Sequence, residues 1–166
     1  MEQIKASFER IAGELIKDPA LGRGTGKTVV RLDDGLTCQI QSGPWRFVAD
    51  MPKTSGGDES GPTPGMYGRA ALGSCLAIGY AMRAARNDIK LDSIEVEVQA
   101  DYDEGATFGT RDVPAGYTEV RYTVTIATSA PEADVMRVLD EADKHSPYLD
   151  VFARAQRCVR TVKFAR

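Results

Sequence analysis

The chain has 166 residues, a net charge of −3 and a pI of about 5.3, so its length indicates one globular domain. This weakly acidic balance excludes a strong positive field, and we expect neither nucleic acid nor a membrane as a partner. Three scattered cysteines without a Cys-x-x-Cys pair, and a single histidine, predict no disulfide framework, no metal site and no cofactor. With no signal-peptide pattern at the start, the expected location is the reducing cytoplasm.

Residues 3–17 have the spacing of an amphipathic helix, with apolar side chains at Ile4, Phe8, Ile11 and Leu15. Asp18-Pro19 ends this helix, because the residue before a proline disfavours helical geometry. We therefore predict a helical extension over residues 1–20 and a main domain over residues 21–166.

Residues 22–28 read Gly-Arg-Gly-Thr-Gly-Lys-Thr and resemble a phosphate-binding loop. That motif needs a glycine where Leu21 stands, with a strand before it and a helix after it. Here a helix precedes the glycines and β-prone residues follow them. We reject the phosphate loop and predict a flexible entry to a sheet.

Three short β-prone runs, 27–32, 36–41 and 45–50, are separated by turn residues and predict an antiparallel meander. Residues 52–64 are rich in Gly, Ser, Pro and acidic side chains and predict a mobile loop.

The central stretch is a predicted helix over 66–86, with Thr63 as N-cap and Pro64 in the first turn. No charge interrupts residues 70–82, and apolar side chains fall on all sides, which is typical of a helix buried all round. The run is shorter than the roughly 20 residues a membrane span needs. Close packing is the expected reason for Gly73 and Gly79.

Two later runs, 94–102 and 119–126, alternate strictly between apolar and polar residues and predict antiparallel strands with one dry face. Ser129 and Glu132 match a capping box for a helix over 130–144. The positions expected on its apolar face are Ala133, Met136, Leu139 and Ala142.

Ser146-Pro147 predicts another N-cap and helix start, and residues 157–164 predict a last strand. Helices and antiparallel strands follow one another without repeats, so the predicted fold class is α+β.

The turn Gly61-Pro62-Thr63-Pro64, followed eleven residues after Pro64 by Cys75 inside a buried helix, resembles the OsmC/Ohr family. The alternating strand pair, the following helix and the X-Pro helix start at Ser146-Pro147 continue the resemblance over roughly residues 24–165. It implies an OsmC-like fold: antiparallel sheets with two long central helices, one from each chain of an intertwined homodimer.

The resemblance also implies a chemistry. Characterised members reduce organic or hydrogen peroxides with a thiolate at the position of Cys75, which becomes a sulfenic acid. A second cysteine, just before the proline of the later helix, then forms a disulfide that an external dithiol reduces.

Two departures from the family pattern bear on that chemistry. Ser146 stands where the resolving cysteine is expected, and Gly65 stands where the hydroperoxide branch has glutamate. The family arginine that supports the thiolate comes from the N-terminal strands, and Arg23, Arg31 and Arg46 all remain open as its counterpart.

Each site residue also has a purely structural interpretation. A lone cysteine on a buried helix is usually a small core side chain. Ser146 is explained as an N-cap, and His145 beside it does not make a catalytic pair, because sequence neighbours do not face each other on a helix. Cys38 and Cys158 fall in predicted strands, where packing is the default, although either could resolve a sulfenate if it lay close to Cys75.

Two functions follow. The first is a thiol-dependent peroxidase that uses Cys75 alone and is resolved by an external thiol reductant or by Cys38 or Cys158. The second is a non-catalytic OsmC-fold protein that binds a small apolar ligand in the same pocket at the dimer interface. A purely structural dimer is the third alternative.

Overall fold

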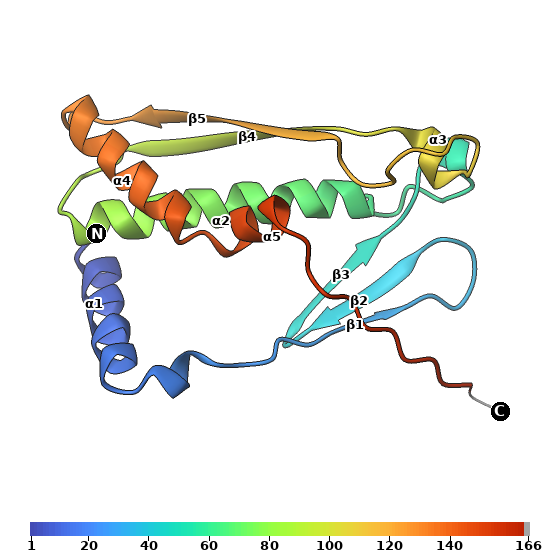
Figure 1. Ribbon diagram of the computed structural model, residues 1–166, viewed down its shortest axis with the longest axis horizontal. Helices are drawn as coiled ribbons and strands as arrows, with labels where there is room; N and C mark the ends of the chain where they lie inside the picture. Colours follow the sequence, from blue (N-terminus) through green and yellow to red (C-terminus); the bar gives the residue numbers. More distant parts are fainter. Residues whose placement is uncertain (165–166) are drawn as a thin grey trace.

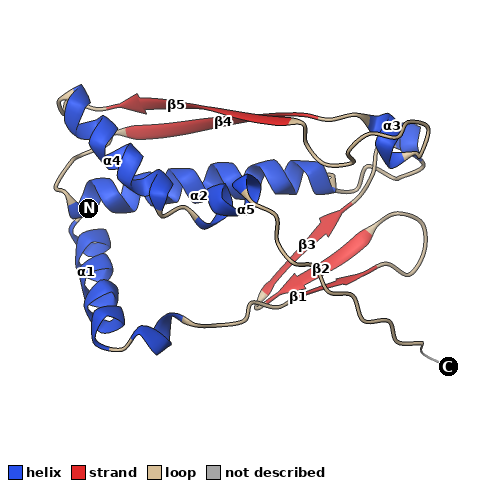
Figure 2. Cartoon of the chain, viewed as in Figure 1, coloured by secondary structure: helices blue, strands red, loops and turns tan. Residues whose placement is uncertain are grey.

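The computed structural model describes residues 1–164, in which helices and antiparallel strands alternate along the chain (Figures 1 and 2). The helices are α1 (Glu2–Lys17), α2 (Pro64–Arg86), α3 (Glu104–Thr107), α4 (Glu132–Lys144) and α5 (Pro147–Ala153). The strands are β1 (Thr28–Arg31), β2 (Cys38–Ser42), β3 (Trp45–Ala49), β4 (Ser93–Asp101) and β5 (Glu119–Ala127). Short 3-10 turns lie at Pro19–Gly22 and Lys53–Ser55. The α+β prediction is confirmed.

Helix α2 runs along the centre of the molecule, beneath the antiparallel β4–β5 ribbon (Figure 1). Its start is as predicted, because the Thr63 hydroxyl accepts a hydrogen bond from the Met66 amide and Pro64 occupies the first turn. The alternating burial of both strands confirms the period-2 pattern. Their dry face packs on Leu72, Leu76 and Tyr80 of α2, which form the core.

Helices α4 and α5 cover another side of α2, and the predicted face of α4 is confirmed only in part, because Leu139 and Ala142 pack on the core whereas Ala133 and Met136 are exposed. Val135, Val138 and Ala142 are buried, whereas Met136 is 49% exposed. The sequence carries two overlapping apolar stripes that share Leu139 and Ala142. Contact with α2 selects the stripe with the two valines.

The predicted capping box at the start of α4 is wrong. The helix begins at Glu132, directly after Pro131, with no side-chain cap. The Thr128 hydroxyl instead accepts a hydrogen bond from the Ala130 amide and shapes the turn before the helix. Since Pro131 lies between Ser129 and the first helical residue, Ser129 cannot occupy the N-cap position.

Strands β1, β2 and β3 form a separate antiparallel sheet that stands away from α2 (Figure 1). Its end is joined to the start of α2 by the Tyr67 hydroxyl, which donates to the Val48 carbonyl, and by the Asp50 amide, which donates to the Pro62 carbonyl. The loop between β3 and α2 is organised around the buried carboxylate of Asp50.

Part of α2 is not covered by its own chain, so the prediction of a helix buried on every side is wrong for a single chain. Ile78 is 60% exposed, and Ala70 and Ser74 on the same side are also exposed. Gly73 does pack closely, since a Cβ there would lie 3.3 Å from Val98, but a Cβ on Gly79 would meet nothing within 4 Å.

The predicted last strand over 157–164 is also wrong for the single chain. These residues leave α5 as an extended tail without strand pairing (Figure 1). Val159, Val162 and Phe164 are strongly exposed. A strand needs a neighbour to accept its backbone hydrogen bonds, and no strand of the described chain lies in register with the tail.

Candidate functional site

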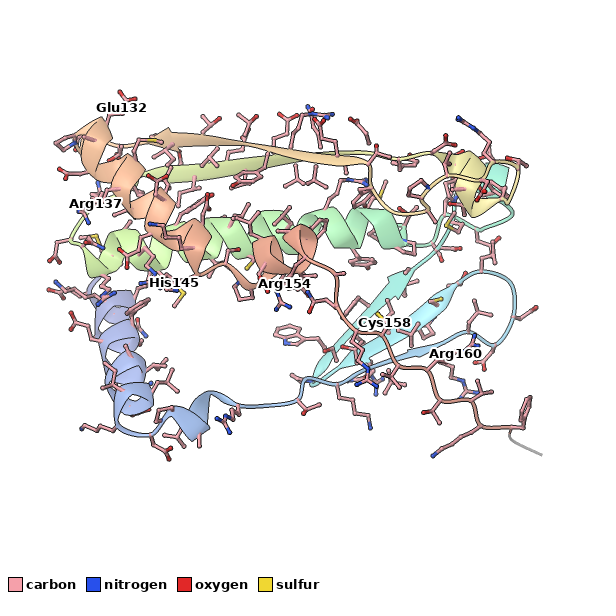
Figure 3. The ribbon with its side chains drawn as sticks, viewed as in Figure 1. Glu132, Arg137, His145, Arg154, Cys158 and Arg160 are labelled. Atoms are coloured by element: carbon pink, nitrogen blue, oxygen red, sulfur yellow. The ribbon has the colours of Figure 1, made fainter. Side chains whose placement is uncertain are left out.

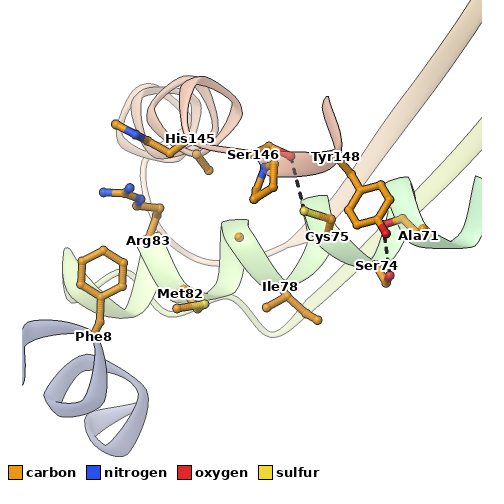
Figure 4. A pocket seen from close by; sticks show the side chains of 13 residues that line it. Phe8, Ala71, Ser74, Cys75, Ile78, Met82, Arg83, His145, Ser146 and Tyr148 are labelled. Carbon is orange, nitrogen blue, oxygen red and sulfur yellow. Dashed lines mark hydrogen bonds between the residues drawn. The ribbon is translucent and has the colours of Figure 1, made fainter. Parts of the chain in front are cut away.

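A cavity of about 610 Å³ opens beside the middle and C-terminal half of α2, where the junction of α4 and α5 crosses it. Cys75, Ile78 and Met82 line it from α2, Ser146 lines it from the α4–α5 junction, and Phe8 of α1 lies at one end (Figure 4). Such a volume is typical of small-molecule sites.

The structure brings Cys75 and Ser146 together, although 71 residues separate them. The Cys75 sulfur lies 3.6 Å from the Ser146 hydroxyl oxygen (Figure 4). Ser146 is 8% exposed and caps α5, where its oxygen accepts a hydrogen bond from the Leu149 amide at 3.3 Å. Because that bond uses an oxygen lone pair, the hydroxyl proton remains free to point at the sulfur.

The carboxylate of a half-buried residue, Asp143, holds the α4–α5 junction in place. Asp143 accepts hydrogen bonds from the Tyr80 hydroxyl at 2.7 Å and from the Tyr122 hydroxyl at 3.0 Å. Burial, together with these bonds to a carboxylate, raises the pKa of Tyr80 and of Tyr122. The Asp143 carbonyl also accepts from the Ser146 amide. One residue of α4 thus ties Ser146 to α2 and β5.

None of the three arginines that the sequence left open lines the cavity. The Arg31 guanidinium pairs with Asp33 at 2.7 Å, the Arg46 guanidinium donates to the Gln41 amide oxygen at 2.8 Å, and Arg23 lies in the exposed loop after α1.

Arg83 is the arginine that lines the cavity with Cys75, and sequence reasoning missed it. It lies 2.7 Å from the Glu141 carboxylate. The available signal was its place on the same helix, eight residues beyond Cys75, which is just over two turns.

The other two cysteines lie outside the cavity, and the single histidine lies in its wall. Neither Cys38 nor Cys158 lines the cavity, and Cys158 lies on the exposed tail (Figure 3). His145 contributes to the lining beside Ser146. Within residues 1–164 no group of three His, Cys, Asp or Glu side chains could hold a metal ion, and no helix is long and apolar enough to cross a membrane.

Solved structures with the same fold come from several bacteria. An OsmC-like protein from Mycoplasma pneumoniae is 16% identical, with a TM-score of 0.67 over 78% of this chain and 88% of the other. An organic hydroperoxide resistance protein OsmC from Legionella pneumophila is 15% identical, with a TM-score of 0.58 over 78% and 91%. The organic hydroperoxide resistance protein OhrB of Bacillus subtilis is 22% identical, with a TM-score of 0.50 over 76% and 89%.

At these identities the structural likeness shows the fold alone. A comparison with curated protein sequences found no match. The sequence model of the OsmC-like protein family matches residues 56–159, which include α2, α4, α5 and both residues of the Cys75–Ser146 contact. The chain therefore belongs to the OsmC-like protein family.

Proposed function

We propose that this protein is a thiol-dependent peroxidase that reduces organic or hydrogen peroxides through Cys75. The observation that carries the proposal is the contact of the Cys75 sulfur with the Ser146 hydroxyl inside a cavity of small-molecule size. Relatives of the same fold are named as organic hydroperoxide resistance proteins, which supports peroxides as the substrate class.

In the first step the Cys75 thiolate attacks one oxygen of the peroxide. An S–O bond forms, the O–O bond breaks, and the leaving oxygen takes a proton and departs as alcohol or water. Cys75 is thereby oxidised to sulfenic acid. A thiolate can only accept hydrogen bonds, so Ser146 is the donor in this state, and its O–H favours the sulfur anion.

In the second step an external thiol resolves the sulfenic acid. Ser146 has no sulfur, and neither Cys38 nor Cys158 lines the cavity. A small thiol attacks the Cys75 sulfur, water leaves, and a mixed disulfide forms. A second thiol then releases Cys75 as the starting thiol. Small thiols of this kind maintain the reducing cytoplasm, where we place the reaction.

The working unit of the proposal is an intertwined homodimer. The exposed side of α2 around Ile78, the open edges of both sheets and the apolar tail from Val159 to Phe164 are surfaces that one chain leaves uncovered. A second copy would supply strands to the edges and a second α2 to the helix face. It would also close the open side of the cavity.

A second candidate function is the binding of a small apolar ligand without catalysis. Two observations favour it. The lining of the cavity is largely apolar, and the Arg83 guanidinium in that lining is paired with the Glu141 carboxylate. In that case Cys75 would be part of the wall and would not react.

Peroxide consumption tests the two candidates. Purified protein is mixed with an organic hydroperoxide or hydrogen peroxide and an excess of a dithiol, and peroxide loss is followed for wild type, Cys75→Ser, Cys38→Ser and Cys158→Ser. The peroxidase proposal expects activity to be lost only in Cys75→Ser, and mass mapping to place the sulfenic acid on Cys75. Equal peroxide loss in wild type and Cys75→Ser would leave the ligand-binding candidate.

A further inference from the structure

We propose that helix α1 is the specificity element of the cavity, with Phe8 as the end wall that limits how long an unbranched apolar chain can extend from Cys75. The inference deepens the proposed function and rests on the same cavity. It assigns a role to the N-terminal extension, which lies outside the segment shared with the family, residues 56–159.

The cavity is elongated along α2. Ile78 and Met82 follow Cys75 at intervals of three and four residues, so the three side chains lie along one face of the helix. From Cys75 to Met82 the helix rises by about 10 Å. Figure 4 shows Phe8 beyond Met82, at the opposite end of the row from Cys75. A ligand that touches the whole row therefore lies parallel to α2 and ends at the Phe8 ring.

Phe8 is held firmly in this position. Its ring is contacted by two guanidinium groups of α2, with Arg83 at 5.0 Å and Arg86 at 5.1 Å from the ring centre. Both arginines lie within 3.5 Å of the Glu141 carboxylate on α4, which orients them. The Lys5 ammonium pairs with Asp88 just past the end of α2.

The rest of α1 contributes little to the core, which points to a local role for Phe8. Ile11 is 44% exposed and Ile16 is 81% exposed. Phe8, in contrast, is half-buried and lines the cavity. The contacts that join α1 to α2 thus include the ring of the residue that closes the cavity.

The chain-length dependence of a thiol reagent tests this inference without any peroxide. A series of n-alkyl methanethiosulfonates is reacted with protein carrying Cys38→Ser and Cys158→Ser. The Cys75 sulfur displaces methanesulfinate and forms a disulfide to the alkyl thiol, so no further oxidant or reductant is needed. The rate at Cys75 should rise by about fourfold per buried methylene until the chain reaches Phe8, and should then stop rising.

Three variants decide the outcome. Phe8→Ala should move the break, the chain length at which the rate stops rising, to longer chains. Phe8→Trp, which keeps an aromatic ring beside the two arginines, should move the break to shorter chains. Ile16→Ala, on the exposed side of the same helix, should leave it unchanged. A break at the same length in wild type, Phe8→Ala and Phe8→Trp would overturn the inference, and so would a Cys75 that no reagent modifies. A break that shifts as stated in a protein without peroxidase activity would refute the proposed function alone.

Discussion

At the scale of single residues, Ser146 has two roles in one position. Its oxygen caps α5 through the Leu149 amide, and the same oxygen lies 3.6 Å from the Cys75 sulfur. The cap explains why a small polar residue stands before Pro147. The contact predicts that a change at this position alters the surroundings of the Cys75 sulfur.

Replacing Ser146 by cysteine should create a dithiol pair with Cys75. The Cys75 sulfur lies 3.6 Å from the oxygen that the new sulfur would replace, so the two sulfurs start close together. We expect faster dithiol-driven turnover of an organic peroxide, with a loss of stability of no more than about 1 kcal/mol from the altered cap. Peroxide consumption and mass mapping of the disulfide measure the effect.

Ser146→Cys combined with Cys75→Ser is the control and should be inactive. A single variant that gains no turnover and forms no bond between positions 75 and 146 would contradict the proposed alignment of the two sites.

Asp50 is a second residue with a decisive local role. Its buried carboxylate accepts hydrogen bonds from the hydroxyls of Ser60 and Thr37 and from the Met51 and Ser60 amides. The Ser60 hydroxyl, followed by the backbone amides, holds the pKa of Asp50 well below its usual range. The bonds fold the loop that delivers Thr63 to the start of α2.

Asp50→Asn should lower the midpoint of denaturant unfolding, because an amide cannot accept from all of these donors. A lowered carboxyl pKa contributes stability that is present above about pH 4 and is lost as the pH falls through the folded-state value. The variant should therefore lose less stability than wild type in this acidic range. Asp58→Asn, an exposed carboxylate on the same loop, is the control and should match wild type.

At the scale of elements, the Asp143 carboxylate joins three of them. Tyr80 reaches it from α2 and Tyr122 from β5, and both hydroxyls donate to it. Apolar contacts alone would let α4 slide along α2, whereas hydrogen bonds at 2.7 and 3.0 Å specify one position. That position sets the distance between Ser146 and Cys75.

Tyr80→Phe should lower the free energy of unfolding by about 2 kcal/mol, since it removes the hydrogen bond of a buried hydroxyl to a charged carboxylate. Tyr102→Phe, which changes an exposed ring, should alter it by less than about 0.5 kcal/mol. Urea unfolding monitored by circular dichroism measures both. An unchanged stability in Tyr80→Phe would show that the network does not hold α4.

The same network predicts sensitivity to alkali. Because the pKa of Tyr80 and of Tyr122 is raised in the folded state, their contribution is complete below the unfolded value of about 10 and is lost as the pH rises above it. Wild type should lose stability above pH 10 more steeply than Tyr80→Phe. Parallel pH dependences in the two proteins would contradict this.

At the scale of the whole molecule, the covered and uncovered sides of α2 differ sharply. The β4–β5 ribbon and helices α4 and α5 enclose the side that carries Leu72, Leu76 and Tyr80. The side that carries Ile78 is open, and Trp45 on β3 is 73% exposed. An apolar surface of this kind is typical of an interface.

Sedimentation should therefore find twice the 18.0 kDa chain mass at micromolar concentration. Ile78→Glu should shift the protein toward the monomer, because it places a charge on the open face of α2. Ile16→Glu makes the same substitution at an exposed position of α1 and should leave the dimer intact. A folded wild-type monomer whose mass does not change with concentration would contradict the homodimer proposal.

Local signals in the sequence were sufficient where a structure depends on neighbours along the chain. Thr63 and Pro64 start α2 as expected, Ser146 and Pro147 start α5, and the two alternating runs form β4 and β5. Caps and alternation act within a few residues, so these elements can be predicted without knowledge of the fold, although the cap expected at Ser129 does not form. The family resemblance added the position of Ser146 relative to Cys75.

Only the tertiary structure decided the rest. The apolar face of α4 was chosen by contact with α2, and residues 157–164 form no strand because strand formation depends on a neighbour that the sequence does not name. The arginine in the cavity is Arg83, not one from the N-terminal strands, and the end wall is Phe8. Contacts of this kind join residues far apart in sequence, and their geometry follows from the packing of whole elements, which no local pattern encodes.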